Sequence, residues 1–545
     1  MLTQKVKWFA LGIVLLFSGS GYKNASYLLN VGIEKQNPYL IWQAFVLGES
    51  DASAALLNLK LSDTSKVLWY DVLALNGNID AAKYLADNTI HKGTQTHYYR
   101  LAAEQGDANA QFEYALLQDA DLSEMQRFLT LSAEQGYPPA VIAYAKFLHA
   151  KLDANEADIL YWLDKASKLD AESAIKLAKR FWLNHNKKDA IKYFEHAKSM
   201  GNSRASAYIN VLQNYNEQTL NALFDNAETG TDVNCLQTIQ PIARSLESMV
   251  QAVSMYNDFK KDERLASLDM CLLVPRWLPE NEMKCHFDTS TGRNTCDLIE
   301  LASYKKNLPF SHMVFFVERG KAYVQNGIMY VDLADEYSVF VHELAHFVGF
   351  VDEYKLTEAT ANNYCMPDSV PNLLFYEPSA PEARKKLAWW NELFDKTQLR
   401  INMPDDIEGK KSVATILAGE NALGQSKAQK AAPIDNTGAG EGVAVDSINV
   451  EGPSLIEPEP QPSLSISSSR ACDSLDIKSF KPTSEITFLE HHDTENIPAL
   501  YIHMWQAMLE EKTDEKPLIK ALFNAANQSK NADLIDHWAD VYYSL

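Results

Sequence analysis

The first third of the chain repeats a pattern of apolar and small residues. In each copy an aromatic residue stands eight positions before a Gly or its substitute, and a small residue follows four positions later. The copies are Trp69/Gly77/Ala81, Tyr98/Gly106/Ala110, Phe128/Gly136/Ala140, Trp162/Asp170/Ala174 and Tyr193/Gly201/Ala205, preceded by Leu40/Gly48/Ala52, which lacks the aromatic residue. The aromatic copies are spaced 29, 30, 34 and 31 residues apart. This period is typical of a repeated helical unit.

Each copy predicts a helical hairpin. The Gly ends the first helix in a left-handed turn, and the small residue lets the second helix approach the first. A single hairpin cannot bury its apolar stripe, so neighbouring hairpins must stack. We therefore expect an all-α helical-repeat solenoid over residues 38–215, with the Leu40 copy as its cap.

Beyond the repeats, runs typical of β-strands replace the Ala-rich helices. His312–Val317 predicts a strand, and two further strand patterns flank Asn326-Gly327 within residues 321–333. Asn-Gly suits the tight turn of a β-hairpin. The pattern indicates an α+β domain over residues 216–403.

The chain then loses its apolar periodicity. No aromatic residue occurs between Phe394 and Phe480, and the intervening sequence is rich in Gly, Pro, Glu and Ser. Such a segment cannot bury enough apolar area to offset its ordering entropy. We expect a disordered linker over 404–470 and a small α-helical C-terminal segment over 471–545. The predicted protein is multidomain.

Residues 1–22 have the pattern of an export signal. Lys5 and Lys7 precede a strongly apolar run, Trp8–Phe17, which has the length of a signal-peptide core and is short for a membrane span. We expect a signal peptide, with an uncleaved N-terminal anchor as the alternative; only that anchor would touch a membrane. Either one predicts an exported protein, in the periplasm or cell envelope or secreted.

The cysteine content agrees with export. The number is even, which favours disulfides in an oxidising compartment, although sequence leaves the pairing open. The nearest two, Cys285 and Cys296, would staple a hairpin. The six are Cys235, Cys271, Cys285, Cys296, Cys365 and Cys472.

The charge balance narrows the range of partners. The chain has 50 Lys and Arg against 72 Asp and Glu, a net charge of −22. A broad nucleic-acid-binding surface needs clustered basic residues. We therefore expect no nucleic-acid partner.

Candidate chemistry lies in H-E-L-A-H-F-V-G-F-V-D-E-Y, residues 342–354. His342 and His346 are four apart, so both imidazoles project from one face of a helix, where they can bind one Zn²⁺. Glu343 stands beside the metal as a candidate general base. Gly349 breaks the helix, which lets Asp352 return as a third ligand. A fourth position stays open for water, as in catalytic zinc sites.

Two details of this helix stay open. Its N-cap is predicted to be Asp335 or Ser338. Glu353 and Glu358 compete with Asp352 as third ligand, and we favour Asp352 because its spacing matches a chain that reverses at the Gly.

Two resemblances to known families rest on these motifs. The A-E-Q-G segments of the repeats resemble Sel-one-like repeats, relatives of the tetratricopeptide repeat, which implies a scaffold that binds a protein partner. H-E-x-x-H-x-x-G-x-x-D resembles the metzincin zinc peptidases in the variant with an Asp ligand. The following D-E-Y is similar to the immunoglobulin-A-protease-like metallopeptidases.

The zincin resemblance implies roles for specific residues. His342, His346 and Asp352 would ligate Zn²⁺, and Glu343 would be the catalytic base. It also implies a Met in a turn beneath the metal, for which Met366 is the first candidate and Met403 the second. Tyr354 would either stabilise the oxyanion or serve the structure.

The expected function is therefore that of an exported zinc metallopeptidase, a hydrolase acting on a protein or peptide substrate. Zinc is the expected cofactor, and the repeats would form a protein-binding module. Two rival functions are an envelope interaction scaffold with a structural or inactive zinc site, and a zinc amidase acting on cell-wall material.

Overall fold

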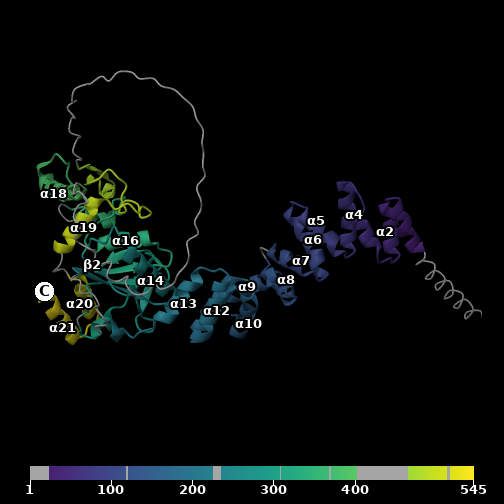
Figure 1. Cartoon of the computed structure of the whole chain (residues 1–545), viewed down its shortest axis with the longest axis horizontal. Coiled ribbons are helices and arrows are strands. Elements are labelled where there is room, and N and C mark those ends of the chain that lie inside the picture. Colours follow the sequence, from purple (N-terminus) through teal and green to yellow (C-terminus); the bar gives the residue numbers. More distant parts are fainter. Residues whose placement is uncertain are drawn as a thin grey trace, which may run out of the picture. The chain divides into compact units, whose positions relative to one another are not determined.

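The structure is a computed structural model of the whole chain (Figure 1). It describes residues 24–117, 121–224, 235–306, 308–366, 370–401, 464–511 and 516–544. The expected signal peptide, 1–22, and most of the expected linker lie outside the described residues. The chain forms two compact units, Met1–Asn214 and Tyr215–Leu545.

The first unit is a row of helix pairs (Figure 1). The pairs are α2 (Pro38–Val46) with α3 (Ala52–Leu57), α4 (Asp63–Leu75) with α5 (Ile79–Asp87), α6 (Lys92–Glu104) with α7 (Ala108–Leu116), α8 (Leu122–Glu134) with α9 (Pro138–Ala150), α10 (Glu156–Ser167) with α11 (Ala171–Leu183), and α12 (Lys187–Ser199) with α13 (Arg204–Asn214).

The turn and contact positions of the repeats behave as the pattern predicts. The glycines between paired helices have positive φ, from 79° to 93°; they are Gly48, Gly77, Gly106, Gly136 and Gly201. The small residues four positions later have no exposed surface; they are Ala52, Ala81, Ala110, Ala140, Ala174 and Ala205. Asp170, which replaces a Gly, instead caps α11 by accepting a hydrogen bond from the Ser173 N–H. The helical-repeat prediction is confirmed, including the Leu40 copy.

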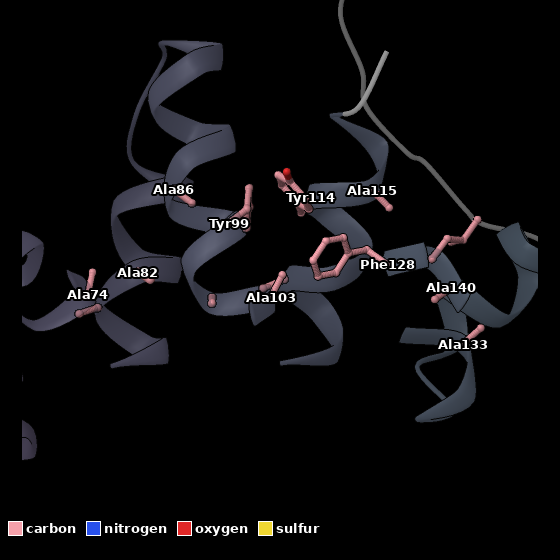
Figure 2. Packing of buried hydrophobic residues seen from close by; sticks show 14 of the residues in the cluster. Ala74, Ala82, Ala86, Tyr99, Ala103, Tyr114, Ala115, Phe128, Ala133 and Ala140 are labelled. Carbon is pink, nitrogen blue, oxygen red and sulfur yellow. The ribbon is translucent and has the colours of Figure 1, made fainter. Parts of the chain in front are cut away.

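Large rings fill the space that the alanines leave between successive pairs. Tyr114 on α7 meets Phe128 on α8 edge-to-face, with ring centroids 4.9 Å apart (Figure 2). Ala103, Ala115 and Ala133, which Figure 2 also labels, belong to the same buried cluster. The core of the unit is therefore a continuous row of alternating large and small side chains.

The second unit is built on a mixed sheet in the order β2-β1-β6-β8-β7, with β3 paired to β1. All neighbours are parallel except β7 and β8, which form the expected antiparallel hairpin. The strands are β1 (Gln237–Ala243), β2 (Met270–Leu272), β3 (Arg276–Trp277), β6 (His312–Phe316), β7 (Tyr323–Gln325) and β8 (Ile328–Val331). Asn326 and Gly327 have φ of 53° and 75°, as a tight hairpin turn requires.

Helices cover both faces of this sheet. α14 (Leu246–Lys261) and α16 (Tyr337–His346) pack on one face. On the other face, Phe315 and Tyr330 share a core with α15 (Ile299–Ser303), α20 (Pro517–Ser529) and α21 (Ala532–Tyr543). The helix α16, which carries the histidine motif, therefore packs on one face of the sheet.

Smaller elements surround this core. They are η1 (Leu220–Phe224), the hairpin β4 (Cys285–Asp288) with β5 (Arg293–Cys296), α17 (Glu358–Tyr364), η2 (Pro381–Ala383), α18 (Arg384–Ile401), the antiparallel pair β9 (Ser467–Ser469) with β10 (Ser479–Lys481), η4 (Asp473–Leu475) and α19 (Ala499–Glu511).

Two predictions about this unit need correction. The C-terminal part, 471–545, contains the helices α19, α20 and α21, but it is not a separate segment, because α20 and α21 complete the core of the sheet. It also contains strand β10, whose partner β9 lies within the expected linker 404–470. The N-cap of α16 is Glu336, which makes no side-chain capping bond, instead of Asp335 or Ser338. Asp335 is engaged elsewhere, because its Oδ2 accepts the Asp332 N–H at 2.7 Å.

All six cysteines form disulfides: Cys235–Cys271, Cys285–Cys296 and Cys365–Cys472. The second bridge staples the hairpin β4–β5 as expected. The third joins the end of α17 to the C-terminal part, across 107 residues of sequence. Three bridges are typical of a protein that folds in an oxidising, exported environment. Among the described residues no helix is both long and apolar enough to cross a membrane.

Candidate metal centre

Two imidazoles meet on one face of α16. His342 and His346 lie one helical turn apart, and their Nε2 atoms are 3.1 Å from each other. The Nδ1–H of His342 donates to the Phe488 carbonyl at 2.8 Å, and that of His346 donates to the Phe350 carbonyl at 2.8 Å. These hydrogen bonds place the remaining proton of a neutral ring on Nδ1. Both Nε2 lone pairs therefore face the same point in space.

The chain reverses directly after the helix and brings a carboxylate to that point. Gly349 has a φ of 93°, which a residue with a side chain rarely adopts. After this turn, Oδ1 of Asp352 lies 2.9 Å from Nε2 of His342 and 3.3 Å from Nε2 of His346.

These three atoms form a fitting site for a divalent cation. Each atom is an acceptor once the imidazole protons sit on Nδ1, and the buried Asp352 Oδ1 has no hydrogen-bond donor. Three lone pairs within 3.3 Å of one another repel unless positive charge lies between them. Ligands at about 2.0–2.1 Å from a tetrahedral zinc are separated by about 3.3 Å. The residue set and its spacing therefore fit zinc.

Without an ion, the electrostatics of the centre favour a proton shared between the imidazoles and Asp352. Burial disfavours both charged forms, yet the Asp352 and Glu343 carboxylates raise the pKa of His346 to about 9. In return the two imidazoles hold the pKa of Asp352 well below its usual range. The arrangement stabilises a positive charge at the point where the three side chains meet.

Glu343 lies beside this point. It follows His342 on α16, is 6% exposed, and its Oε2 has no hydrogen-bond partner among the described residues. One ligand atom from each of His342, Glu343 and His346 fits within 4.8 Å. Burial raises the pKa of Glu343 above its ordinary value, against the opposing effect of the histidines. A carboxyl group in this setting is suited to accept and return a proton.

The other two candidates for the third ligand lie elsewhere. Glu353 is 1% exposed and turns into the interior, where its carboxylate accepts hydrogen bonds from Asn372, Thr487 and Tyr501. Glu358 is exposed at the start of α17. Of the three carboxylates, the structure brings only Asp352 to both histidines.

Tyr354 and Met366 occupy the surface. Tyr354 is 43% exposed, and burial together with the Asp352 carboxylate raises the pKa of its hydroxyl. Met366 is 52% exposed and follows the bridged Cys365. An exposed side chain cannot pack beneath a metal, so the expectation for Met366 is corrected. Met403 lies outside the described residues.

Sequence patterns did not reveal the groups that orient the histidines. Phe350 and Phe488 contribute backbone carbonyls, and every residue type carries that group. Phe488 is 146 residues from its partner, His342. Because every residue has a carbonyl and these two residues are far apart in the sequence, no sequence pattern identifies this contact.

Comparisons with known proteins add little. No known protein family and no curated protein matches the chain. Among solved structures, the chain is similar to a Sel1 repeat protein from Oxalobacter formigenes, with 17% identity and a TM-score of 0.24. The match covers 35% of this chain and 87% of that one. The helical repeat is established by the helix pairs of the structure itself.

Proposed function

We propose that the protein is an exported zinc-dependent peptidase. The observation that carries this proposal is the convergence of three acceptor atoms, from His342, His346 and Asp352, beside the buried and unpartnered carboxylate of Glu343. Three protein ligands with a neighbouring carboxylate match the donor set of catalytic zinc, in which a water completes the coordination.

The residues divide the work of peptide hydrolysis. His342, His346 and Asp352 would hold the ion, and the Phe488 and Phe350 carbonyls keep both Nε2 atoms available for it. A bound zinc would act as a Lewis acid and would lower the pKa of its coordinated water to about 7.

Glu343 would move the protons. Its position beside the proposed ligands would let it accept a proton from the attacking water and return it to the leaving amine. Its burial also limits competition from bulk water for that proton.

The edge of the sheet offers a place for an extended substrate. β7 stands last in the strand order, so one side of it has no strand partner among the described residues. A peptide can add to such an edge through main-chain hydrogen bonds. The hairpin β7–β8 leads directly into α16, which places this edge close in sequence to the metal centre.

The repeats are proposed to bind a protein partner. Several large apolar side chains of this unit are more than half exposed, including Leu68, Leu75 and Tyr161. Stacked hairpins present such side chains along an extended surface, which suits recruitment of a protein.

The function is tested with a pair of variants. Purified wild-type protein is expected to contain about one zinc and to cleave an unfolded protein such as casein. Glu343→Gln should keep the metal and lose about 10² to 10⁴ in cleavage rate, because the general base is gone. Glu358→Gln, at an exposed site, is the matched control and should retain both zinc and cleavage.

Other results would favour the rival functions. Zinc without cleavage of any peptide would point to an interaction scaffold with a structural metal. Cleavage confined to cell-wall fragments would identify a zinc amidase. Undiminished cleavage by Glu343→Gln would contradict the assignment of Glu343 as the base.

A further inference from the structure

Three consecutive residues of the C-terminal part, Thr487–Leu489, reach the metal centre. The Phe488 carbonyl accepts the Nδ1–H of His342 at 2.8 Å. On either side, the Thr487 hydroxyl donates to Oε2 of Glu353 at 2.5 Å, and the Leu489 carbonyl accepts the Glu353 N–H at 2.9 Å. This strip therefore bonds directly to one candidate ligand, His342, and to Glu353, which follows another candidate ligand, Asp352, in the sequence.

Both the carboxylate and the backbone of Glu353 accept hydrogen bonds. Its Oε1 accepts hydrogen bonds from the Tyr501 hydroxyl at 2.6 Å and from Nδ2 of Asn372 at 3.0 Å. The buried Nζ of Lys481 lies 3.7 Å from Oε2 of Glu353 and also pairs with the Glu490 carboxylate, so the two carboxylates share one positive charge. The Glu353 carbonyl accepts the Ser469 hydroxyl at 3.0 Å. A fully bonded, buried carboxylate tolerates little displacement, so the preceding residue, Asp352, is held as well.

The two orienting carbonyls share one aromatic support. Phe350 and Phe488 provide the carbonyls, and their rings pack against Tyr501 and Trp505 of α19, with centroid separations from 5.9 to 6.2 Å. Tyr501 also donates to Glu353. The helix α19 thus contacts Phe350, Phe488 and Glu353.

We propose, building on the metal site of the proposed peptidase, that Glu353 is a positioning residue. Through the strip Thr487–Leu489 and α19 it holds Asp352 and the two imidazoles in the arrangement that zinc requires. The C-terminal part would thereby complete the metal centre, although none of its side chains is a proposed ligand.

The first test removes one hydroxyl. Thr487→Ala deletes the donor to Glu353, and Thr487→Ser keeps it. The zinc dissociation constant, measured by competition with a chelator, is expected to rise about tenfold or more in the Ala variant, as for other outer partners of metal ligands. The Ser variant should restore wild-type affinity. In the cobalt-substituted protein, the visible absorption spectrum should change in the Ala variant alone.

A second pair guards against misfolding. Tyr501→Phe removes the other short hydrogen bond to Glu353 but keeps the ring. Its control is Tyr330→Phe, because the buried Tyr330 hydroxyl also has a partner, the Cys296 N–H at 3.0 Å, but lies in the core on the opposite face of the sheet. Weakened zinc binding is expected only for Tyr501→Phe, with both variants shown to be folded by circular dichroism.

The outcomes separate this inference from the proposed function. Folded Thr487→Ala and Tyr501→Phe variants that bind zinc as tightly as wild type would overturn the positioning role and leave the metal site standing. Wild-type protein that binds no zinc would overturn both. Zinc bound by wild type and weakened in the variants, with no peptide cleavage, would support positioning and contradict only the peptidase function.

Discussion

At the scale of single residues, the candidate metal centre brings three hydrogen-bond acceptors close to one another. This arrangement is unfavourable unless positive charge lies between them. Nε2 of His342, Nε2 of His346 and Oδ1 of Asp352 lie within 3.3 Å of one another. Glu343 adds a second buried carboxylate without a hydrogen-bond partner at Oε2. Buried polar groups are normally satisfied, and a bound cation would satisfy this cluster of acceptors, as the proposed function requires.

A nearby carboxyl, Asp335, predicts a pH effect on stability. Burial raises its pKa from 3.8 to about 6, so in the folded state it resists ionisation between these values. Well below the ordinary pKa of 3.8 both states are protonated and no cost arises. Above pH 6 the folded state holds a charged carboxylate at a cost of about 1 to 2 kcal/mol, allowing for partial exposure. Asp335→Asn should therefore gain stability over wild type as pH rises from 4 to 7.

Chemical unfolding at several pH values measures this difference. Asn retains the oxygen that accepts the Asp332 N–H, so the neutral variant keeps the local turn. A constant difference between Asp335→Asn and wild type would contradict the prediction.

At the scale of elements, glycine turns join the paired helices of the repeats. Gly106 ends α6 with a φ of 93°, and a Cβ added there would meet no atom within 4 Å. The turn therefore depends on backbone conformation and not on space. Gly349 has the same φ, 93°, after α16, and there the turn returns Asp352 to the histidines.

The repeat turn is tested by two substitutions on one helix. Gly106→Ala should lower the free energy of unfolding of the repeat unit by about 1 to 2 kcal/mol, because a left-handed conformation is strained for Ala. Gly93, near the start of α6, has open space around it and an ordinary φ. Gly93→Ala should stabilise the unit by about 0.5 kcal/mol. Equal effects in denaturant unfolding would argue against strain at the turn.

At the scale of the whole molecule, the second unit is completed by elements that follow residue 464. α20 and α21 supply Leu518, Leu522 and Trp538 to the core beneath the sheet. The Cys365–Cys472 disulfide ties this returning chain to the end of α17. Folding of the second unit therefore depends on residues that follow position 464 as well as on those of the sheet.

Disulfide removal measures that dependence. Cys365 and Cys472 are 107 residues apart in sequence, whereas Cys285 and Cys296 are 11 apart. Because a longer closed loop restricts the unfolded chain more, replacing the first pair by Ala should cost about 2 kcal/mol more than replacing the second. Chemical denaturation of the two double variants compares them. A larger cost for Cys285–Cys296 would show that loop entropy does not control their stabilities.

Local patterns were sufficient for much of this fold. The spacing of aromatic, Gly and Ala residues predicted the helix pairs, and Asn326-Gly327 predicted the hairpin β7–β8, because both depend on contacts between residues close in sequence. The pair His342 and His346 was visible for the same reason, since four residues on a helix form one turn.

Contacts between distant segments were decided by the tertiary structure. Sequence left Asp352, Glu353 and Glu358 as rival ligands, and only the folded chain shows that Glu353 is buried among Asn372, Thr487 and Tyr501 instead. The sequence also did not indicate that the C-terminal part belongs to the second unit.

The physical difference between the two kinds of information is the length of chain that separates the interacting groups. Helix period, turn conformation and residue spacing act over a few residues and are written directly in the sequence. The pairing of Glu353 with Thr487, of His342 with the Phe488 carbonyl and of Cys365 with Cys472 is decided by packing across more than a hundred residues of sequence. Such choices become definite only when hydrophobic burial has brought the segments together.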